Sequence, residues 1–194
     1  MRSATITRNT QETKISLSLG LDGSGQGTID SGIGFLDHML TLFKAHGQFD
    51  LTLSAQGDLS VDQHHCVEDI GICLGTTFKE ALGDGAGIRR FGWGLICMDE
   101  ALCQMAIDIS GRPFLAFDAP FPKAKVGDFD LELIEEFFHG FVSNAKIALH
   151  LRLLSGQNLH HMAESCFKAL GIVLDQATQL DNRKKGIPST KGVL

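Results

Sequence analysis

Two copies of a His-His-x-x-Glu motif provide six side chains that could bind metal ions. These side chains are His64, His65, Glu68, His160, His161 and Glu164. On a helix, residues i and i+4 share one face, about 5–6 Å apart, so the first histidine and the glutamate of each motif can bind one cation. The second histidine points about 100° away and could serve another ion or a neighbouring subunit.

The alternative is ordinary helix-start polarity, in which histidine and glutamate side chains cap a first turn. The two motifs lie 96 residues apart, and the same shift superposes Leu74 and Gly75 on Leu170 and Gly171. Two copies in register are not expected by chance. The repeat therefore favours metal binding.

Two residues upstream of the motifs are candidates for completing the metal sites. His38 lies 26 residues before the first motif and Glu136 lies 24 residues before the second, each on a predicted helix. If the halves of the chain are equivalent, these residues occupy matching places. Nitrogen and oxygen ligands without thiolate suit manganese, iron or zinc. For Glu136 a solvated helix face is the alternative, because Glu132 and Glu135 flank it.

Hydrophobic periodicity predicts the elements that must position these residues. The first unit comprises a strand at 15–19, a hairpin turn at 22–25, a helix at 33–46, a strand at 49–55 and a helix at 62–82. The same order returns with strands near 93–109 and 114–118, a helix at 130–145, a strand at 147–153 and a helix at 159–178. The sequence therefore predicts an internal duplication.

The Gly-rich stretch at 83–87 is the natural junction of that duplication, which gives a first repeat at 1–87 and a second at 88–180. The remaining residues, 181–194, are basic and lack hydrophobic periodicity. We expect them to form a mobile C-terminal tail.

Composition narrows the class of protein. The chain has 194 residues and a net charge of −6, which argues against general binding to nucleic acid or an anionic membrane. No apolar run reaches the roughly 18 residues of a membrane span, and the start lacks a signal-peptide core, so we expect a soluble cytoplasmic protein. The five cysteines form no C-x-x-C pair and are interpreted as reduced thiols, mostly in the core.

Several dispersed segments resemble the imidazoleglycerol-phosphate dehydratase family of histidine biosynthesis. They are GIGFLDHM (32–39), DQHHCVED (62–69), SGRP (110–113), NLHHMAESCFKAL (158–170) and STKG (189–192). The resemblance implies an α/β (α+β) two-layer sandwich, duplicated from a sheet/helix half-domain like domain 2 of ribosomal protein S5, with helices on one face of each sheet. It also implies a homo-oligomer, a 24-subunit cage built from trimers, with two Mn²⁺ per active site at subunit interfaces.

Carried over residue by residue, the resemblance assigns roles to particular side chains. The metal ligands would be His38, His64, His65, Glu68, Glu136, His160, His161 and Glu164. The residues that bind substrate and its phosphate would be Glu12, Arg90, Arg112, Lys168, Ser189 and Lys191. Two positions depart from the family pattern, because Leu42 stands where Gln is usual and Glu136 where His is frequent.

The two catalytic candidates are Glu12, as acid/base, and His46 at the end of the first predicted helix. Without the resemblance, Glu12 is interpreted as an exposed turn residue. His46 is then interpreted as a polar residue that interacts favourably with the C-terminal end of its helix. Each basic residue of the phosphate set, taken alone, is interpreted as a solvated surface charge. Lys168 stands four residues after Glu164 and extends the metal-binding stripe of its helix.

The implied reaction removes water from imidazole glycerol phosphate and gives imidazole acetol phosphate. No carbonyl activates the proton that is lost, so the ring must supply the electrons. Metal ions on both ring nitrogens would favour imidazolate, which can expel the hydroxyl group and form a diazafulvene-like intermediate. A base then removes the neighbouring proton.

Two other classes of function remain open from the residues alone. A metal-dependent hydrolase would use similar ligands, although neither H-E-x-x-H nor a deaminase motif is present. A non-catalytic metal-binding cage protein would not need Arg90, Arg112 and Lys191 around a small phosphate.

Overall fold

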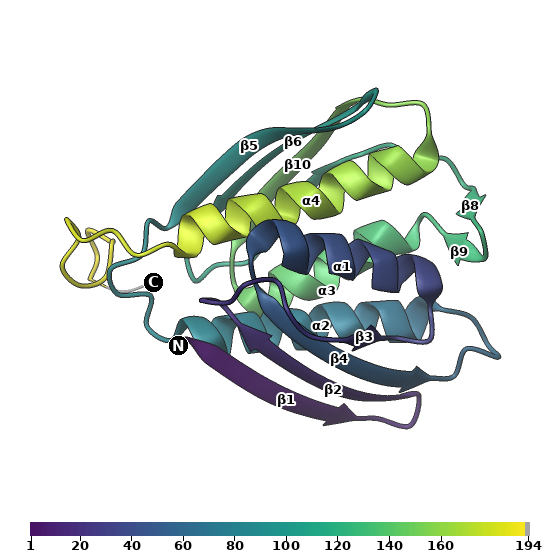
Figure 1. Ribbon diagram of the computed structural model, residues 1–194, viewed down its shortest axis with the longest axis horizontal. Coiled ribbons are helices and arrows are strands. Elements are labelled where there is room, and N and C mark those ends of the chain that lie inside the picture. Colours follow the sequence, from purple (N-terminus) through teal and green to yellow (C-terminus); the bar gives the residue numbers. More distant parts are fainter. Residues whose placement is uncertain (193–194) are drawn as a thin grey trace.

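Two four-stranded sheets enclose four helices in this computed structural model, which describes residues 1–192 (Figure 1). The first half contains β1 (Ser3–Asn9), β2 (Thr13–Gly20), β3 (Ile29–Asp30), α1 (Gly34–Gly47), β4 (Asp50–Gly57) and α2 (His64–Leu82). The second contains β5 (Phe91–Met98), β6 (Ala101–Asp108), β7 (Phe114–Asp118), β8 (Lys125–Val126), β9 (Phe129–Asp130), α3 (Leu133–Ala145), β10 (Ala148–Ser155) and α4 (Leu159–Thr178).

The two halves have the same strand topology. The sheet orders are β1-β2-β4-β3 and β5-β6-β10-β7, and in each the last strand pairs parallel to its neighbour while the others are antiparallel. The predicted duplication is confirmed. The helices lie on one face of each sheet, and the halves meet through these helices so that both sheets are outermost (Figure 1).

Alternating burial explains why one face of each sheet receives the helices. Ile15, Leu17 and Leu19 of β2 point inward and are at most 1% exposed. Leu17 pairs with Leu53 and Leu19 with Leu51, so the apolar side chains of β2 and β4 share one face. Burial of these side chains is the main force holding helix to sheet.

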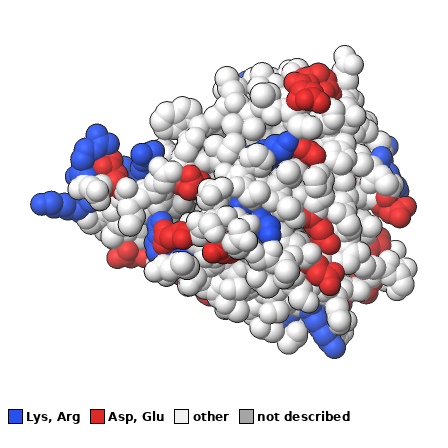
Figure 2. Space-filling model, in the orientation of Figure 1, with Lys and Arg blue, Asp and Glu red and all other residues white. Residues whose placement is uncertain are grey.

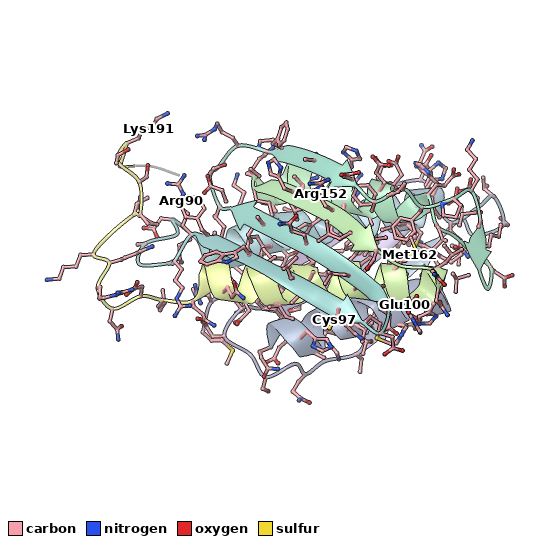
Figure 3. All side chains as sticks on the ribbon, turned by 90° about the horizontal axis from the view of Figure 1, so that it is seen from above. Arg90, Cys97, Glu100, Arg152, Met162 and Lys191 are labelled. Carbon is pink, nitrogen blue, oxygen red and sulfur yellow. The ribbon has the colours of Figure 1, made fainter. Side chains whose placement is uncertain are left out.

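The outward faces of the two sheets differ in chemistry. The first carries small polar side chains, such as the exposed Thr5, Ser16 and Thr52. The second carries large apolar ones, namely Phe91, Trp93, Leu95 and Phe114, which are 50–69% exposed. A hollow of about 650 Å³ on this second face is lined by Trp93 and Leu95 together with the polar side chains of Gln104, His150 and Arg152. Figure 3 shows this face from outside. Such a patch is unusual for a monomer surface and typical of an interaction site.

Close helix contacts at glycine join the two halves. A Cβ at Gly171 of α4 would lie 2.4 Å from the carbonyl oxygen of Phe43 and 2.9 Å from the nitrogen of Gly47, both in α1. In the same way, a Cβ at Gly75 of α2 would lie 2.3 Å from the carbonyl oxygen of Phe141 and 2.9 Å from the nitrogen of Ala145, both in α3. The crossing of α1 with α4 is therefore repeated by that of α3 with α2.

Several element boundaries differ from those predicted. The hairpin joins β1, which was not predicted, to β2, and its turn precedes Thr13. The expected hairpin at 22–25 is instead a loop that leads to β3, held where the Asp50 carboxylate accepts the N–H groups of Ser24 and Gln26 at 2.9 Å. The helix expected from residue 130 begins at Leu133, because residues 129–130 pair with β8 as a short strand.

Among the described residues, no helix is both long and apolar enough to cross a membrane. All five cysteines are free, and four are buried, while Cys97 is exposed. Burial raises the pKa of the Cys66 and Cys73 thiols to about 11, so these side chains are protonated at neutral pH.

The glycine contact predicts a large effect of one added methyl group. Gly171→Ala should lower the free energy of unfolding by about 1–3 kcal/mol, because the α1 backbone must move to accommodate Cβ. Gly34→Ala in α1 is the matched control, since no atom lies within 4 Å of its Cβ position. Thermal unfolding of the three proteins tests this. A Gly171→Ala midpoint at or above that of Gly34→Ala would contradict the prediction.

Candidate metal centre and phosphate-binding residues

The contact of α1 with α4 brings three predicted ligands together. His38 Nε2 lies 2.8 Å from Glu164 Oε1, and His160 Nε2 lies 3.0 Å from the same oxygen. One donor atom from each side chain lies within 4.8 Å of the other two. His38 belongs to the first half of the chain and the other two residues to the second, so the group exists only because the halves pack together.

Glu164 is the buried centre of this group, with 7% of the residue exposed. Burial alone would raise the pKa of its carboxyl group, but hydrogen bonds from Lys168 and His38, with a further one from His160, outweigh burial and hold this pKa at about 2. Lys168 Nζ lies 2.6 Å from Glu164 Oε2, so the two carboxylate oxygens serve different partners. Partial desolvation, assisted by the Lys168 charge, lowers the pKa of His46.

An open cavity of about 510 Å³ gives access to the group. His38 and His160 line it, together with Phe129 of the short β8–β9 hairpin. Gln63, at the start of α2, also lines the cavity, and its buried Oε1 has no hydrogen-bond partner among the described residues. An unpaired acceptor in the wall of a cavity that two imidazoles also line suits a hydrated cation, which brings both positive charge and O–H donors.

The first-half motif is more open. His64 Nε2 and Glu68 Oε2 are 3.9 Å apart, and about half of the Glu68 side chain is exposed. Glu136 lies on α3, which packs against the α2 helix that carries this motif. No second group of three donor side chains within residues 1–192 is as compact as the one around Glu164.

The second histidine of each motif contacts a carboxylate that the sequence analysis did not select. Asp58 Oδ2 lies 3.1 Å from His65 Nδ1, and Glu100 Oε2 lies 2.8 Å from His161 Nδ1. Glu12 is more distant from His65, with 3.8 Å between its Oε1 and Nε2. Aligning the hairpins of the two repeats could have found Glu100, because it directly precedes β6 as Glu12 directly precedes β2.

Most predicted phosphate ligands lie far from the metal ligands. Arg90 and Lys191 are at one end of the molecule and Glu100, beside the start of α4, is at the other (Figure 3). The Arg90 guanidinium binds Asp108 at 2.6 Å and 3.0 Å and the carbonyl oxygen of Pro188 at 2.9 Å. Arg90 and Ser189 line a shallow groove of about 480 Å³.

The other two cations of the predicted phosphate set are Arg112 and Lys168. Arg112 is exposed in the turn before β7, while Lys168 alone of the phosphate set touches the metal-ligand group. Blue side chains gather on the tail that projects from one end of the molecule (Figure 2). One chain thus separates a cationic end from a metal-binding end.

The fold and this geometry define a duplicated α/β protein with an imidazole–carboxylate metal-binding group between its halves. A family model for imidazoleglycerol-phosphate dehydratase matches residues 31–174. Enzymes of that name from Citrifermentans bemidjiense and Pelobacter propionicus are each 57% identical over 193 residues, covering 100% of this chain and 99% of theirs. The chain belongs to the imidazoleglycerol-phosphate dehydratase family.

Solved structures agree with this assignment. The crystal structure of imidazoleglycerol-phosphate dehydratase from Staphylococcus aureus has a TM-score of 0.84 and 41% identity, covering 92% of this chain and 99% of that one. The enzyme from Pyrococcus furiosus, in complex with (S)-C348, has a TM-score of 0.84 and 36% identity, covering 97% and 100%. The duplicated α/β fold expected from the sequence is therefore confirmed.

The buried carboxylate predicts how a single substitution changes metal binding. Glu164→Gln removes a negative ligand from the group, so Mn²⁺ affinity should fall by about 100-fold or more, beyond the loss typical of residues around a ligand. Titration calorimetry on the metal-stripped full chain measures this. Glu80→Gln, at an exposed position near the end of α2, is the control and should bind Mn²⁺ like the unaltered chain. Equal affinity for both variants would contradict the prediction.

Proposed function

We propose that this protein dehydrates imidazole glycerol phosphate to imidazole acetol phosphate, as a metal-dependent carbon–oxygen lyase of histidine biosynthesis. The supporting observation is the group formed by His38, His160 and Glu164, which offers two imidazole nitrogens and a carboxylate oxygen in a chain similar over its full length to dehydratases of that name. Hydroxide leaves the carbon attached to the ring, a proton leaves the neighbouring carbon, and the resulting enol becomes the ketone. The net loss is one water.

We assign two Mn²⁺ to the site. The proposed ligands are His38, His64, His65, Glu68, Glu136, His160, His161 and Glu164. When bound, a divalent metal ion favours the deprotonated form of an imidazole ligand, and an anionic substrate ring supplies the electrons that expel hydroxide. The Nε2 atoms of His38 and His160 already converge on one carboxylate oxygen, so little reorganisation is needed to bind a cation there.

Glu12 is the proposed acid/base. It lies in the turn between β1 and β2, its side chain is 54% exposed, and its carboxylate approaches His65 without a hydrogen bond. A carboxylate free of strong partners can accept a proton from substrate and return it. His46, exposed at the end of α1, is the second candidate for contact with substrate.

Substitution of Glu12 separates catalysis from binding. Glu12→Gln should bind Mn²⁺ normally but turn over imidazole glycerol phosphate about 10²- to 10⁴-fold more slowly, the usual range for a general acid–base group. Ketone release by the purified protein is the assay. Near-normal turnover would remove Glu12 from the mechanism. Absence of ketone from the unaltered chain, with hydrolysis of esters or amides instead, would favour the hydrolase alternative.

Phosphate binding is assigned to Arg90, Arg112, Lys168, Ser189 and Lys191, whose guanidinium, ammonium and hydroxyl groups suit phosphate oxygens. Arg90 and the tail lie at the opposite end of the chain from Glu100 and the adjacent start of α4 (Figure 3). A complete site therefore needs a second copy of the chain. The tail would close over the phosphate, ordering when substrate binds and shielding the site from water.

The proposed assembly follows from this separation. We propose self-association into trimers and a 24-subunit cage, and the outer face of the second sheet, with the exposed Trp93 and Leu95 on its edge strand β5, offers a surface for such contacts. The first sheet presents polar side chains on its outer face and lacks this feature. The two sheets would therefore have different neighbours in the assembly.

Shared sites predict complementation between two inactive variants. Glu164→Gln damages the metal end and Lys191→Ala the phosphate end, so each homogeneous protein should turn over substrate slowly. Co-expressed chains should recover part of the lost turnover, because some sites combine an intact metal end with an intact tail from another chain. Turnover no higher than the average of the two variants would show that each chain supplies both ends of its own site.

A further inference from the structure

Glu100 connects the β5–β6 turn to the beginning of α4. Its Oε1 accepts the backbone N–H groups of Gln157 at 3.2 Å and Asn158 at 2.7 Å, while its Oε2 lies 2.8 Å from His161 Nδ1. Asn158 caps α4, and its side-chain oxygen accepts the N–H groups of His160 and His161 at 2.9 Å and 3.3 Å. One carboxylate thus holds both the helix start and one imidazole.

These contacts determine which nitrogen of His161 carries the proton. An ionised carboxylate can only accept hydrogen bonds, so the neutral imidazole must donate from Nδ1 and keep its lone pair on Nε2. The Glu100 carboxylate accepts hydrogen bonds on both of its oxygens, from two backbone N–H groups on Oε1 and from His161 on Oε2, and these contacts compensate its negative charge. No hydrogen bond engages Nε2 of His161 among the described residues.

The first half of the chain reaches the same result with a different residue. Asp58, after β4, binds Nδ1 of His65, while Glu12 occupies the hairpin place equivalent to that of Glu100. Because Asp58 holds the imidazole, Glu12 is not required there and remains largely exposed. The same hairpin position thus carries a fixed carboxylate in one half and a free one in the other.

We propose that Glu100 is a positioning residue, which fixes the Nδ1–H tautomer of His161 so that Nε2 is free to bind a metal ion. The inference rests on the proposed function, in which His161 is a metal ligand. A carboxylate behind a metal-binding histidine orients the ring and makes the ligating nitrogen more basic.

Glutamine at this position should be worse for metal binding than alanine. In Glu100→Gln the amide oxygen stays with the two backbone N–H groups, and the NH₂ group then faces His161 Nδ1. The imidazole must accept from it, so the proton moves to Nε2 and blocks the ligating lone pair. In Glu100→Ala the ring can still adopt either tautomer. A merely structural role gives the opposite order, because Gln preserves the backbone contacts that Ala loses.

Mn²⁺ titration of the metal-stripped full chain tests the proposal, with the unaltered chain, Glu100→Gln, Glu100→Ala, His161→Ala and the control Glu80→Gln. We expect His161→Ala to lose one class of Mn²⁺ site. Glu100→Gln should weaken that class by about 10- to 100-fold, the range for residues behind a ligand, and Glu100→Ala should weaken it less. Thermal unfolding should show the reverse order, with Glu100→Ala the less stable variant.

Three results would overturn the proposal, and they are distinguishable. If His161→Ala lowers Mn²⁺ binding while Glu100→Gln does not, the ligand assignment stands and the positioning role is wrong. If Glu100→Ala weakens binding as much as Glu100→Gln or more, Glu100 acts only through the helix start. If His161→Ala binds Mn²⁺ normally, the proposed ligand set itself is wrong and the inference falls with it.

Discussion

The backbone contact of α4 with α1 is the constraint on which the candidate site depends. His38 comes from one repeat and Glu164 from the other, and the 2.8 Å between them is possible only if the two helices are nearly in contact. Gly171 permits this approach, because a side chain there would meet the carbonyl oxygen of Phe43. Gly171 follows Glu164 by about two turns of the same helix, so a displacement of α4 at the crossing would also displace the ligands that α4 carries. Fold stability and ligand geometry thus share one contact.

The charge arrangement follows from burying Glu164 at that contact. A buried carboxylate is tolerated only when cations or hydrogen-bond donors replace its water. Lys168 takes one oxygen, and the imidazoles of His38 and His160 approach the other. A divalent cation bound between the imidazoles would take the place of the hydrogen bonds that now join them to the carboxylate. The side chains need little movement for that exchange.

Local periodicity was enough to predict the repeated unit and the helices that carry both motifs. It could not predict which of the two motifs His38 approaches, since that depends on how four helices pack between the sheets. It also missed β1, whose buried face is incomplete, with side chains that alternate between exposed and half-buried. Asp58 and Glu100 lie in turns, where no periodicity marks a functional side chain. Comparing the repeats position by position, rather than only their motifs, would have found Glu100.

Divergence between the repeats explains why equivalent motifs have unequal surroundings. Ile72 occupies in α2 the place that Lys168 occupies in α4, so Glu68 has no lysine one turn below it. Accordingly Glu68 stays about half exposed, whereas Glu164 is buried and paired. The second-half motif is closed by His38 from within the chain, while the first-half motif keeps carboxylate oxygens open to solvent. The two copies of the motif thus share their sequence pattern, while differences in their neighbours make only the second-half motif part of a compact group of donor side chains among the described residues.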